Sequence, residues 1–316
     1  MMPLQPNLEF MTFAVSVIGP VILMIAFGYG LYKYGTLDNN FVEKASRLVF
    51  NFALPALLFS TISTSSVGQL ANFTVISVGM GGTLLVFLAM LMITPLIINK
   101  VDRGVVIQGS FRSNMGIVGL AYCANAFGSE GLAYGSVYLG GLTILYNLLS
   151  VAVLNVFQDK ETSYTKIGKD IATNPIILSI IAGLLVSILS IELPAIVTNS
   201  AAYFAQLTLP LALLCTGAAL RFSTMRQNGI AGIFSIIVKC IFYPIIVVGI
   251  AIFAGIEGMP LMIIFLMAIS PTAAASYVMV RKIGGNHELA AQIIAISTVV
   301  SVPFTLLGFA IIREFV

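Results

Sequence analysis

Residues 18–31 read IGPVILMIAFGYGL, and residues 173–186, at a separation of 155, read TNPIILSIIAGLLV. At the same separation, FALPALLFST (52–61) aligns with LTLPLALLCT (207–216). Each pair shares a proline, and the first pair also shares a glycine. A single offset that serves two matches indicates that the chain contains two related halves. Chance similarity between apolar segments is the alternative.

The composition indicates that both halves lie in a lipid bilayer. The chain has 316 residues, of which 59% are hydrophobic and 9% charged, whereas a soluble domain is about 25% charged. A helix needs about 20 apolar residues to cross a bilayer, and strands of alternating hydrophobicity are absent. The sequence therefore predicts an all-α integral membrane protein with ten transmembrane helices, at residues 10–32, 41–62, 72–98, 104–127, 131–157, 172–190, 196–220, 228–255, 260–280 and 288–312.

The positive charges in the connections predict the orientation, since Lys and Arg gather on the cytoplasmic side. The second, fourth, sixth and eighth connections contain neither residue, and the odd-numbered connections hold nearly all of them. The sequence therefore predicts a multi-pass protein of the cell membrane with both termini outside. The residues that set this orientation are Lys33, Lys44, Arg47, Lys100, Arg103, Lys160, Lys166, Lys169, Arg221, Arg226, Arg281 and Lys282.

Each half contains five spans, so the second half must enter the membrane from the opposite side. The predicted organisation is a first five-helix repeat (1–157), a cytoplasmic linker (158–170) and a second, inverted repeat (171–316). Inverted repeats are typical of secondary transporters, in which alternating access moves a solute across the bilayer. An intramembrane enzyme or receptor has no comparable need of them.

The predicted substrate site lies where helices are interrupted near the midplane. The fourth span, QGSFRSNMGIVGLAYCANAFG (108–128), is too polar to face lipid, and the offset places Pro271 opposite Gly116. Proline removes a backbone donor and breaks a helix, so we expect broken helices four and nine to cross. A simple proline kink beside a small-residue packing face is the alternative. The candidates here are Arg112, Ser113, Asn114, Met115, Gly116, Ser270, Pro271 and Thr272.

Two cations, Arg112 and Lys239, lie inside spans, and no span interior offers an Asp or Glu. An intramembrane cation is costly and usually faces a cavity. A positive cavity without a fixed carboxylate favours an anion as the solute, while snorkelling of either side chain toward the cytoplasm is the alternative. Among other buried polar residues, Asn147 is a substrate-site candidate, and Asn51 and Gln292 are secondary candidates. Packing between helices is the alternative for all three.

The sequence contains little that would indicate an enzyme or a metal-binding protein. The HExxH, GxSxG and aspartate-rich motifs are absent, and the three cysteines have no partner at ligand spacing. We expect no cofactor, no metal centre and no nucleic-acid partner. Sodium coupling is the alternative to simple anion transport, because neutral oxygens coordinate hard cations. Those oxygens belong to Ser113, Asn114, Ser270, Thr272 and Gln292.

Five segments together resemble the auxin efflux carrier family, especially bacterial members known as malate permeases. They are NFALPALLF (51–59), FRSNMGIVGL (111–120), NPIILSIIAGLL (174–185), PLALLCTGAAL (210–220) and ISPTAAASYVMV (269–280). The resemblance covers essentially the whole chain in the expected order. It implies a fold similar to bile-acid/sodium symporters, with a scaffold domain from spans 1, 2, 6 and 7 and a transport domain from spans 3–5 and 8–10.

The resemblance also implies a malate-like carboxylate as substrate, an elevator-type motion and a homodimer formed through scaffold helices. In the plant carriers the substrate carboxylate lies where spans four and nine cross, near an asparagine that Asn114 matches. The plant carriers have proline in both crossing helices, whereas this chain has Gly116 in the fourth. The long cytoplasmic loop of many plant members is missing, so auxin itself is not the expected substrate.

Overall fold

The computed structural model describes residues 5–65, 73–158, 163–221 and 229–312. Regular structure in these residues is helical, apart from an isolated antiparallel bridge between Ser113 and Thr272, so the predicted all-helical class is confirmed there. The chain divides into two compact units. Unit 1 contains residues 1–72, 116–140 and 172–219, and unit 2 contains residues 73–115, 141–171 and 220–316.

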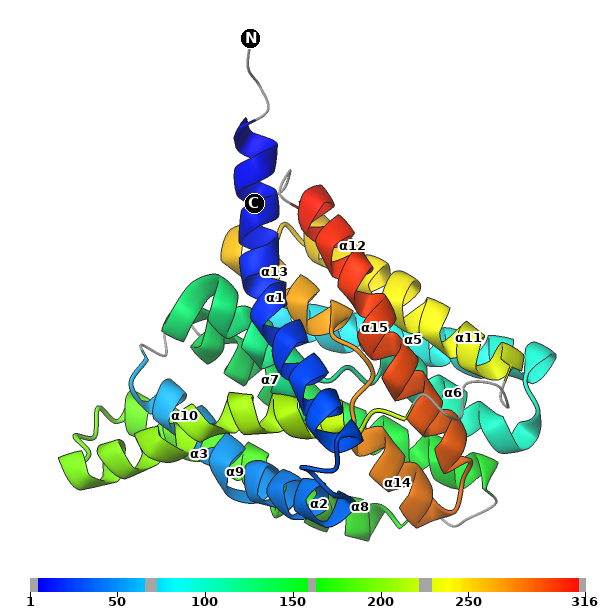
Figure 1. Cartoon of the computed structure of the whole chain (residues 1–316), viewed down its shortest axis with the longest axis horizontal. Helices are drawn as coiled ribbons and strands as arrows, with labels where there is room; N and C mark the ends of the chain where they lie inside the picture. The colour runs from blue at the N-terminus through cyan, green and yellow to red at the C-terminus, as the bar shows by residue number, and fades with distance from the viewer. Residues whose placement is uncertain (1–4, 66–72, 159–162, 222–228, 313–316) are drawn as a thin grey trace. The chain divides into compact units, whose positions relative to one another are not determined.

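Unit 1 is built from two pairs of packed helices (Figure 1). In one pair, α1 (Gln5–Lys33) packs against α10 (Ala195–Ala218); in the other, α3 (Leu54–Ser63) packs against α9 (Pro175–Ile188). The unit also holds α2 (Asn39–Leu48), the π-helical turn η1 (Val49–Ala53) and the first part of α7 (Leu120–Phe157).

Glycines let both pairs approach closely. A Cβ placed on Gly28 of α1 would collide with the carbonyl oxygen of Leu214 in α10, and a Cβ on Gly183 of α9 would lie 3.2 Å from the carbonyl oxygen of Phe59 in α3. Gly28 and Gly183 are the glycines that the sequence repeat aligns. Thus the matched segments α1 and α9 each pack, through the matched glycine, against the second matched segment of the other half.

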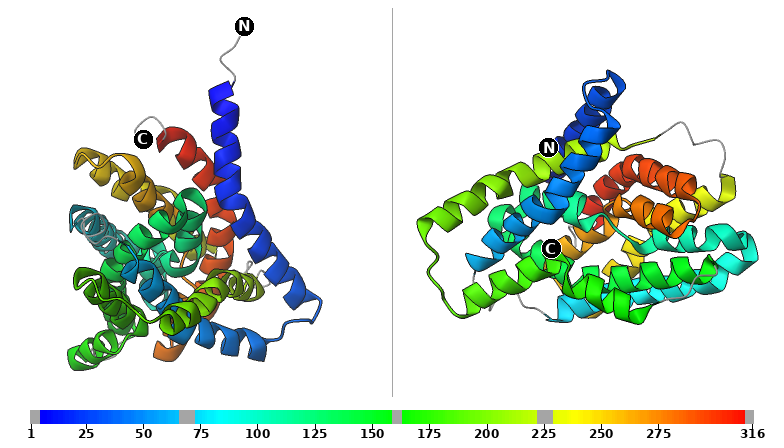
Figure 2. Two further views of the ribbon diagram at one scale, coloured as in Figure 1. Left: turned by 90° about the vertical axis from the view of Figure 1, so that its left-hand side faces the viewer. Right: turned by 90° about the horizontal axis from the view of Figure 1, so that it is seen from below.

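Unit 2 contains the remaining helices, and the chain leaves the helical conformation at two places within it. Its long helices are α5 (Phe73–Ile97) and α15 (His287–Ile312). Helix α5 packs against α6 (Lys100–Phe111) and α12 (Tyr243–Phe253), while α15 packs against α6, α11 (Gly229–Ile237) and α14 (Ala275–Ile283). Figure 2 shows α14 and α15, in orange and red, side by side. Two further short helices are α8 (Tyr164–Ala172) and α13 (Gly258–Ile269).

Seven helices of the described residues are long and apolar enough to cross a membrane. The sequence predicted ten spans, and the difference lies at identifiable places. Predicted spans 104–127 and 260–280 are each interrupted, the span at 172–190 corresponds to the shorter α9, and residues 115–157 run as one element. Within that element Gly128 has non-helical angles (φ 60°, ψ −139°), which marks a kink at the boundary predicted between the fourth and fifth spans. The count of ten remains a prediction.

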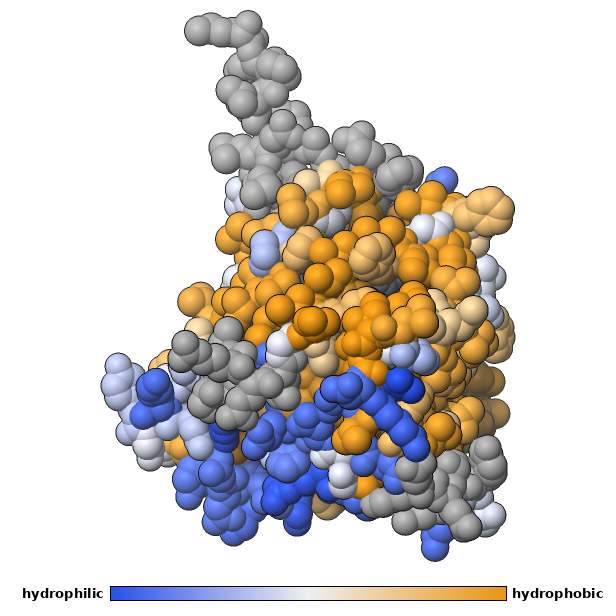
Figure 3. All heavy atoms as spheres, turned by 90° about the vertical axis from the view of Figure 1, so that its right-hand side faces the viewer, coloured by the Kyte–Doolittle hydropathy of each residue, from blue (hydrophilic) through white to orange (hydrophobic). Residues whose placement is uncertain are grey.

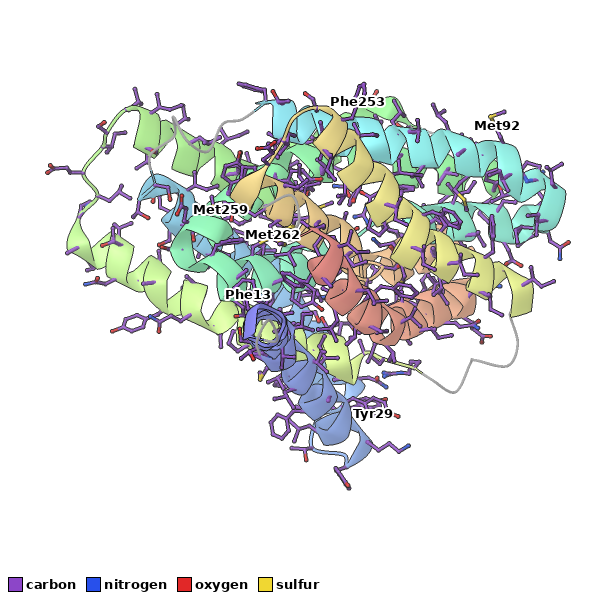
Figure 4. All side chains as sticks on the ribbon, turned by 90° about the horizontal axis from the view of Figure 1, so that it is seen from above. Phe13, Tyr29, Met92, Phe253, Met259 and Met262 are labelled. Carbon is purple, nitrogen blue, oxygen red and sulfur yellow. The ribbon has the colours of Figure 1, made fainter. Side chains whose placement is uncertain are left out.

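The surface agrees with a lipid environment. The face in Figure 3 is largely hydrophobic, and hydrophilic residues gather along its lower edge. The side chains of Met92 and Phe253, labelled in Figure 4, are 77% and 95% exposed. Large exposed apolar surface is unusual in a soluble monomer, so the chain is a multi-pass membrane protein.

Candidate functional site: two facing helix breaks

The chain leaves the helix at both places where the sequence predicts an interruption. Helix α6 ends at Phe111, and Arg112 is extended (φ −77°, ψ 91°). Helix α13 ends at Ile269, and Ser270 is also extended (φ −55°, ψ 142°). Pro271 follows it and has no N–H to continue the helix.

The two breaks pair with each other through their backbones. The Asn114 N–H donates to the Pro271 carbonyl at 2.7 Å, and the Ala273 N–H donates to the Arg112 carbonyl at 2.9 Å. These bonds form the isolated bridge between Ser113 and Thr272. Backbone groups that leave a helix inside a membrane need internal partners, and here each break supplies them to the other.

Hydroxyl groups complete this reciprocal arrangement. Ser113 Oγ donates to the Ala268 carbonyl of α13 at 3.2 Å, and Thr272 Oγ1 donates to the Gly109 carbonyl of α6 at 2.8 Å. Ser270 Oγ donates within its own segment to the Met267 carbonyl at 2.8 Å. The last carbonyls of a helix have no intrahelical donor, so these hydroxyls cap the two interrupted helices.

Lys239 lies in the π-helical turn η3 (Val238–Phe242), between α11 and α12, and is 0% exposed. Its Nζ donates to Ser113 Oγ at 2.6 Å and to the Ala268 carbonyl at 2.7 Å. It also lies 4.5 Å from the centroid of the Tyr243 ring, a favourable cation–π geometry. Because its charge is held at the carbonyl end of α13, Lys239 does not snorkel to the surface.

The Tyr243 side chain extends this cluster by hydroxyl contacts. Its OH lies 2.9 Å from Thr83 Oγ1 and 2.7 Å from the OH of Tyr146. Sequence reasoning missed all three residues. The available signal was spacing, since Tyr243 follows Lys239 by four residues, which places the two on one helical face.

Arg112 is 8% exposed and its guanidinium points to the second part of α7. One terminal nitrogen donates to Ser150 Oγ at 3.1 Å and the other to Asn147 Oδ1 at 2.9 Å. Its Nε is buried and has no partner in the residues that the structure describes. Ser150 was also missed, although it lies three residues after Asn147 on the same helical face.

Neither buried cation has a carboxylate partner among the described residues, since the contacts of both are with neutral oxygens. Asn114, two residues after Arg112, is 5% exposed, and its side-chain amide can donate hydrogen bonds. The breaks therefore combine two positive charges with one unused donor, the Arg112 Nε, which is an arrangement suited to an anion.

The structure brings most of the predicted site residues together in unit 2, namely Arg112, Ser113, Asn114, Asn147, Lys239, Ser270, Pro271 and Thr272. Met115 is 1% exposed and is the last residue of its segment of unit 2, whereas Gly116 falls in unit 1. Asn51 is exposed, in the η1 turn of unit 1. Gln292 is 2% exposed on α15 and faces Gly232 of α11.

Comparison with known proteins gives a consistent result. The family described as "Membrane transport protein" matches residues 13–308. An "Uncharacterized transporter" of Methanothermobacter thermautotrophicus is 21% identical over 89% of this chain and 92% of that protein. A "Putative malonate transporter" of Rhizobium meliloti is 24% identical over 87% of this chain and 90% of its own length.

Proposed function

Because the chain belongs to the membrane transport protein family, as its resemblance to the auxin efflux carriers predicted, we propose that it is a secondary transporter of a small organic anion. The proposed solute is a small carboxylate such as malate or malonate. The name of the Rhizobium meliloti relative supports this class of solute.

The observation that carries the proposal is the pair of buried cations at the helix breaks. Lys239 contacts Ser113, and Arg112 precedes Ser113 in the chain, so both positive charges lie beside one short segment. A buried charge without a counter-ion is costly. A carboxylate that binds at this segment would supply the missing negative charge. The segment would be without that charge again once the solute is released.

The side chains at the breaks favour anion transport without sodium over sodium-coupled transport. Ser113 Oγ, one of the candidate sodium ligands, accepts a hydrogen bond from the Lys239 ammonium at 2.6 Å. A sodium ion on the same oxygen would lie beside a like charge. Sodium coupling through Asn114, Ser270 and Gln292 therefore remains the second candidate, to be separated by experiment.

Alternating access is the proposed mechanism, with an elevator-type motion. Apart from the boundary residues 72 and 220, unit 1 contains predicted spans 1, 2, 6 and 7, and unit 2 contains predicted spans 3, 8, 9 and 10. Predicted spans 4 and 5 are divided between the two units. This division supports a scaffold and a transport domain in part, because the four predicted scaffold spans fall in one unit. The homodimer that we propose, formed through scaffold helices, follows from the family resemblance alone. Arg112, Asn114 and Lys239 are at most 8% exposed, so a solute reaches them only after a rearrangement.

Uptake by proteoliposomes tests the proposal. The purified protein is reconstituted, and accumulation of radiolabelled malonate, malate and a neutral analogue, malonamide, is followed with and without a sodium gradient. We expect saturable uptake of the carboxylates only, which unlabelled carboxylate inhibits, at equal rates in sodium and potassium. Uptake that requires sodium would favour the symporter, and no carboxylate uptake above protein-free liposomes would refute the proposed function.

A further inference from the structure

The guanidinium of Arg112 is held by two residues of one helix. Asn147 Oδ1 and Ser150 Oγ accept from its two terminal nitrogens, at 2.9 Å and 3.1 Å. Because the two acceptors are three positions apart, they project from the same face of α7. Both acceptors are neutral, so they fix the orientation of the guanidinium without cancelling its charge.

We propose that Asn147 and Ser150 are positioning residues, which hold Arg112 so that its Nε edge and its full positive charge face the transported anion. This inference rests on the proposed function and deepens it, because it gives Asn147 a role through Arg112 in place of direct solute contact. Arg112 and Asn114 are then the residues that touch one carboxylate of the solute.

The backbone of the break supports this assignment. Arg112 is extended, and Ser113 pairs with Thr272 as in a β-bridge. Side chains alternate between the two sides of an extended segment, so Arg112 and Asn114 project to one side and Ser113 to the other. Ser113 meets Lys239 and Ala268 on its side.

The side shared by Arg112 and Asn114 presents one unused donor, the Arg112 Nε, beside a side-chain amide. The Nε of Arg112 is buried without a partner in the described part of the chain, and Asn114 is itself only 5% exposed. A guanidinium presents five N–H donors in a fixed plane, and two of its nitrogens are already directed at α7. The remaining edge and the Asn114 amide can donate to the two oxygens of one carboxylate.

Neutral acceptors are essential to this arrangement. An Asp or Glu at position 147 would hold the guanidinium at least as firmly, through a charge-assisted bond. It would also supply the negative charge that the solute otherwise provides. A single isosteric substitution at position 147 can therefore add a negative charge beside Arg112 while the orientation of its guanidinium is kept.

Asn147→Asp is the decisive variant, because it keeps the acceptor for Arg112 and adds a negative charge. Asn155→Asp is the matched control, since it adds the same charge to α7 about 12 Å further along the helix. Malonate affinity is measured by titration calorimetry in detergent, alongside the thermal unfolding temperature. We expect Asn147→Asp to unfold at or above the wild-type temperature and to bind malonate at least tenfold more weakly, while Asn155→Asp binds as wild type does.

Ser150 provides a second measurement. Ser150→Thr keeps a hydroxyl acceptor and should retain malonate affinity, whereas Ser150→Ala should lower it severalfold. Unchanged affinity in Asn147→Asp, with wild-type protein that binds malonate, would show that Asn147 acts only in packing and would overturn the inference. A wild-type protein that binds no carboxylate would overturn the proposed function and this inference together.

Discussion

Ser113, which follows α6, caps the end of α13, and Thr272, which follows α13, caps the end of α6. Ser113 donates to Ala268 of α13, and Thr272 donates to Gly109 of α6. The two breaks therefore stabilise each other, because each supplies a donor to a carbonyl near the end of the other helix.

Removing one of these caps should destabilise the protein. Thr272→Val keeps the side-chain shape and leaves the Gly109 carbonyl without its donor, which costs about 1–3 kcal/mol for a buried group. Thr305→Val is the control, because Thr305 bonds a carbonyl within its own helix at Ser301 and that carbonyl keeps its helical partner. Thermal unfolding in detergent measures both. Equal stability of the two variants would show that the cap at Thr272 contributes nothing.

Lys239 should matter through its charge. Lys239→Arg retains a cation that can donate to Ser113 and Ala268, and should keep part of the transport. Lys239→Met keeps the apolar stem but loses the ammonium, so the Ala268 carbonyl keeps only the Ser113 hydroxyl as a donor and the positive potential is removed. We expect little carboxylate uptake from the Met variant in proteoliposomes, and full uptake would rule out a role for the charge.

Asn114 should contribute directly to binding. Asn114→Ala removes one donor to the solute carboxylate and should weaken binding by about 1–3 kcal/mol, which corresponds to roughly 5- to 150-fold in the dissociation constant. The variant should fold normally, because the Asn114 backbone N–H that bonds Pro271 is retained. Unchanged malonate affinity in calorimetry would place the solute elsewhere, nearer Lys239.

The close packing of α1 against α10 predicts different tolerances at neighbouring glycines. Gly28→Ala would bring its Cβ into the Leu214 carbonyl, whereas a Cβ on Gly30 meets nothing within 4 Å. We expect Gly28→Ala to lower the thermal unfolding temperature and Gly30→Ala to leave it near the wild-type value. The opposite order of stabilities would contradict the described contact.

The orientation can be tested by labelling. Single cysteines at Gly128 or Glu192, introduced into a cysteine-free background, should react with an impermeant maleimide added to intact cells. A cysteine at Glu161, which lies outside the described residues, should react only after the membrane is permeabilised. The reverse pattern would overturn the proposed orientation and the inverted arrangement of the halves.

The positions of the breaks could be predicted from sequence because they depend on local chemistry. A proline at 271 and a polar run at 112–114 cannot continue an apolar helix, and both segments do leave the helix. The absence of a carboxylate partner for Arg112 and Lys239 could also be predicted, since the span interiors contain no Asp or Glu.

The partners of these residues could not be predicted. Sequence spacing alone does not say that Lys239 meets Ser113, 126 positions earlier, because that contact depends on how α11 and α12 pack against α6 and α13. The spacing of Ser150 after Asn147 was visible, but a serine in an apolar helix commonly bonds its own backbone. The offset of the repeat also placed Gly116 opposite Pro271, whereas the observed partner of the Pro271 carbonyl is Asn114.

The pairing of the two breaks has a consequence for biosynthesis. Thr272 and Gly109 are separated by 163 positions, so α6 cannot acquire its cap until most of the chain has been made. Until then, the polar segment at 112–114 must reside in the membrane, or at its edge, without the partners that later satisfy it. Contacts between distant parts of a chain form late and slowly. Nascent chains that stop before residue 272 should therefore be preferred targets of membrane chaperones and quality-control proteases.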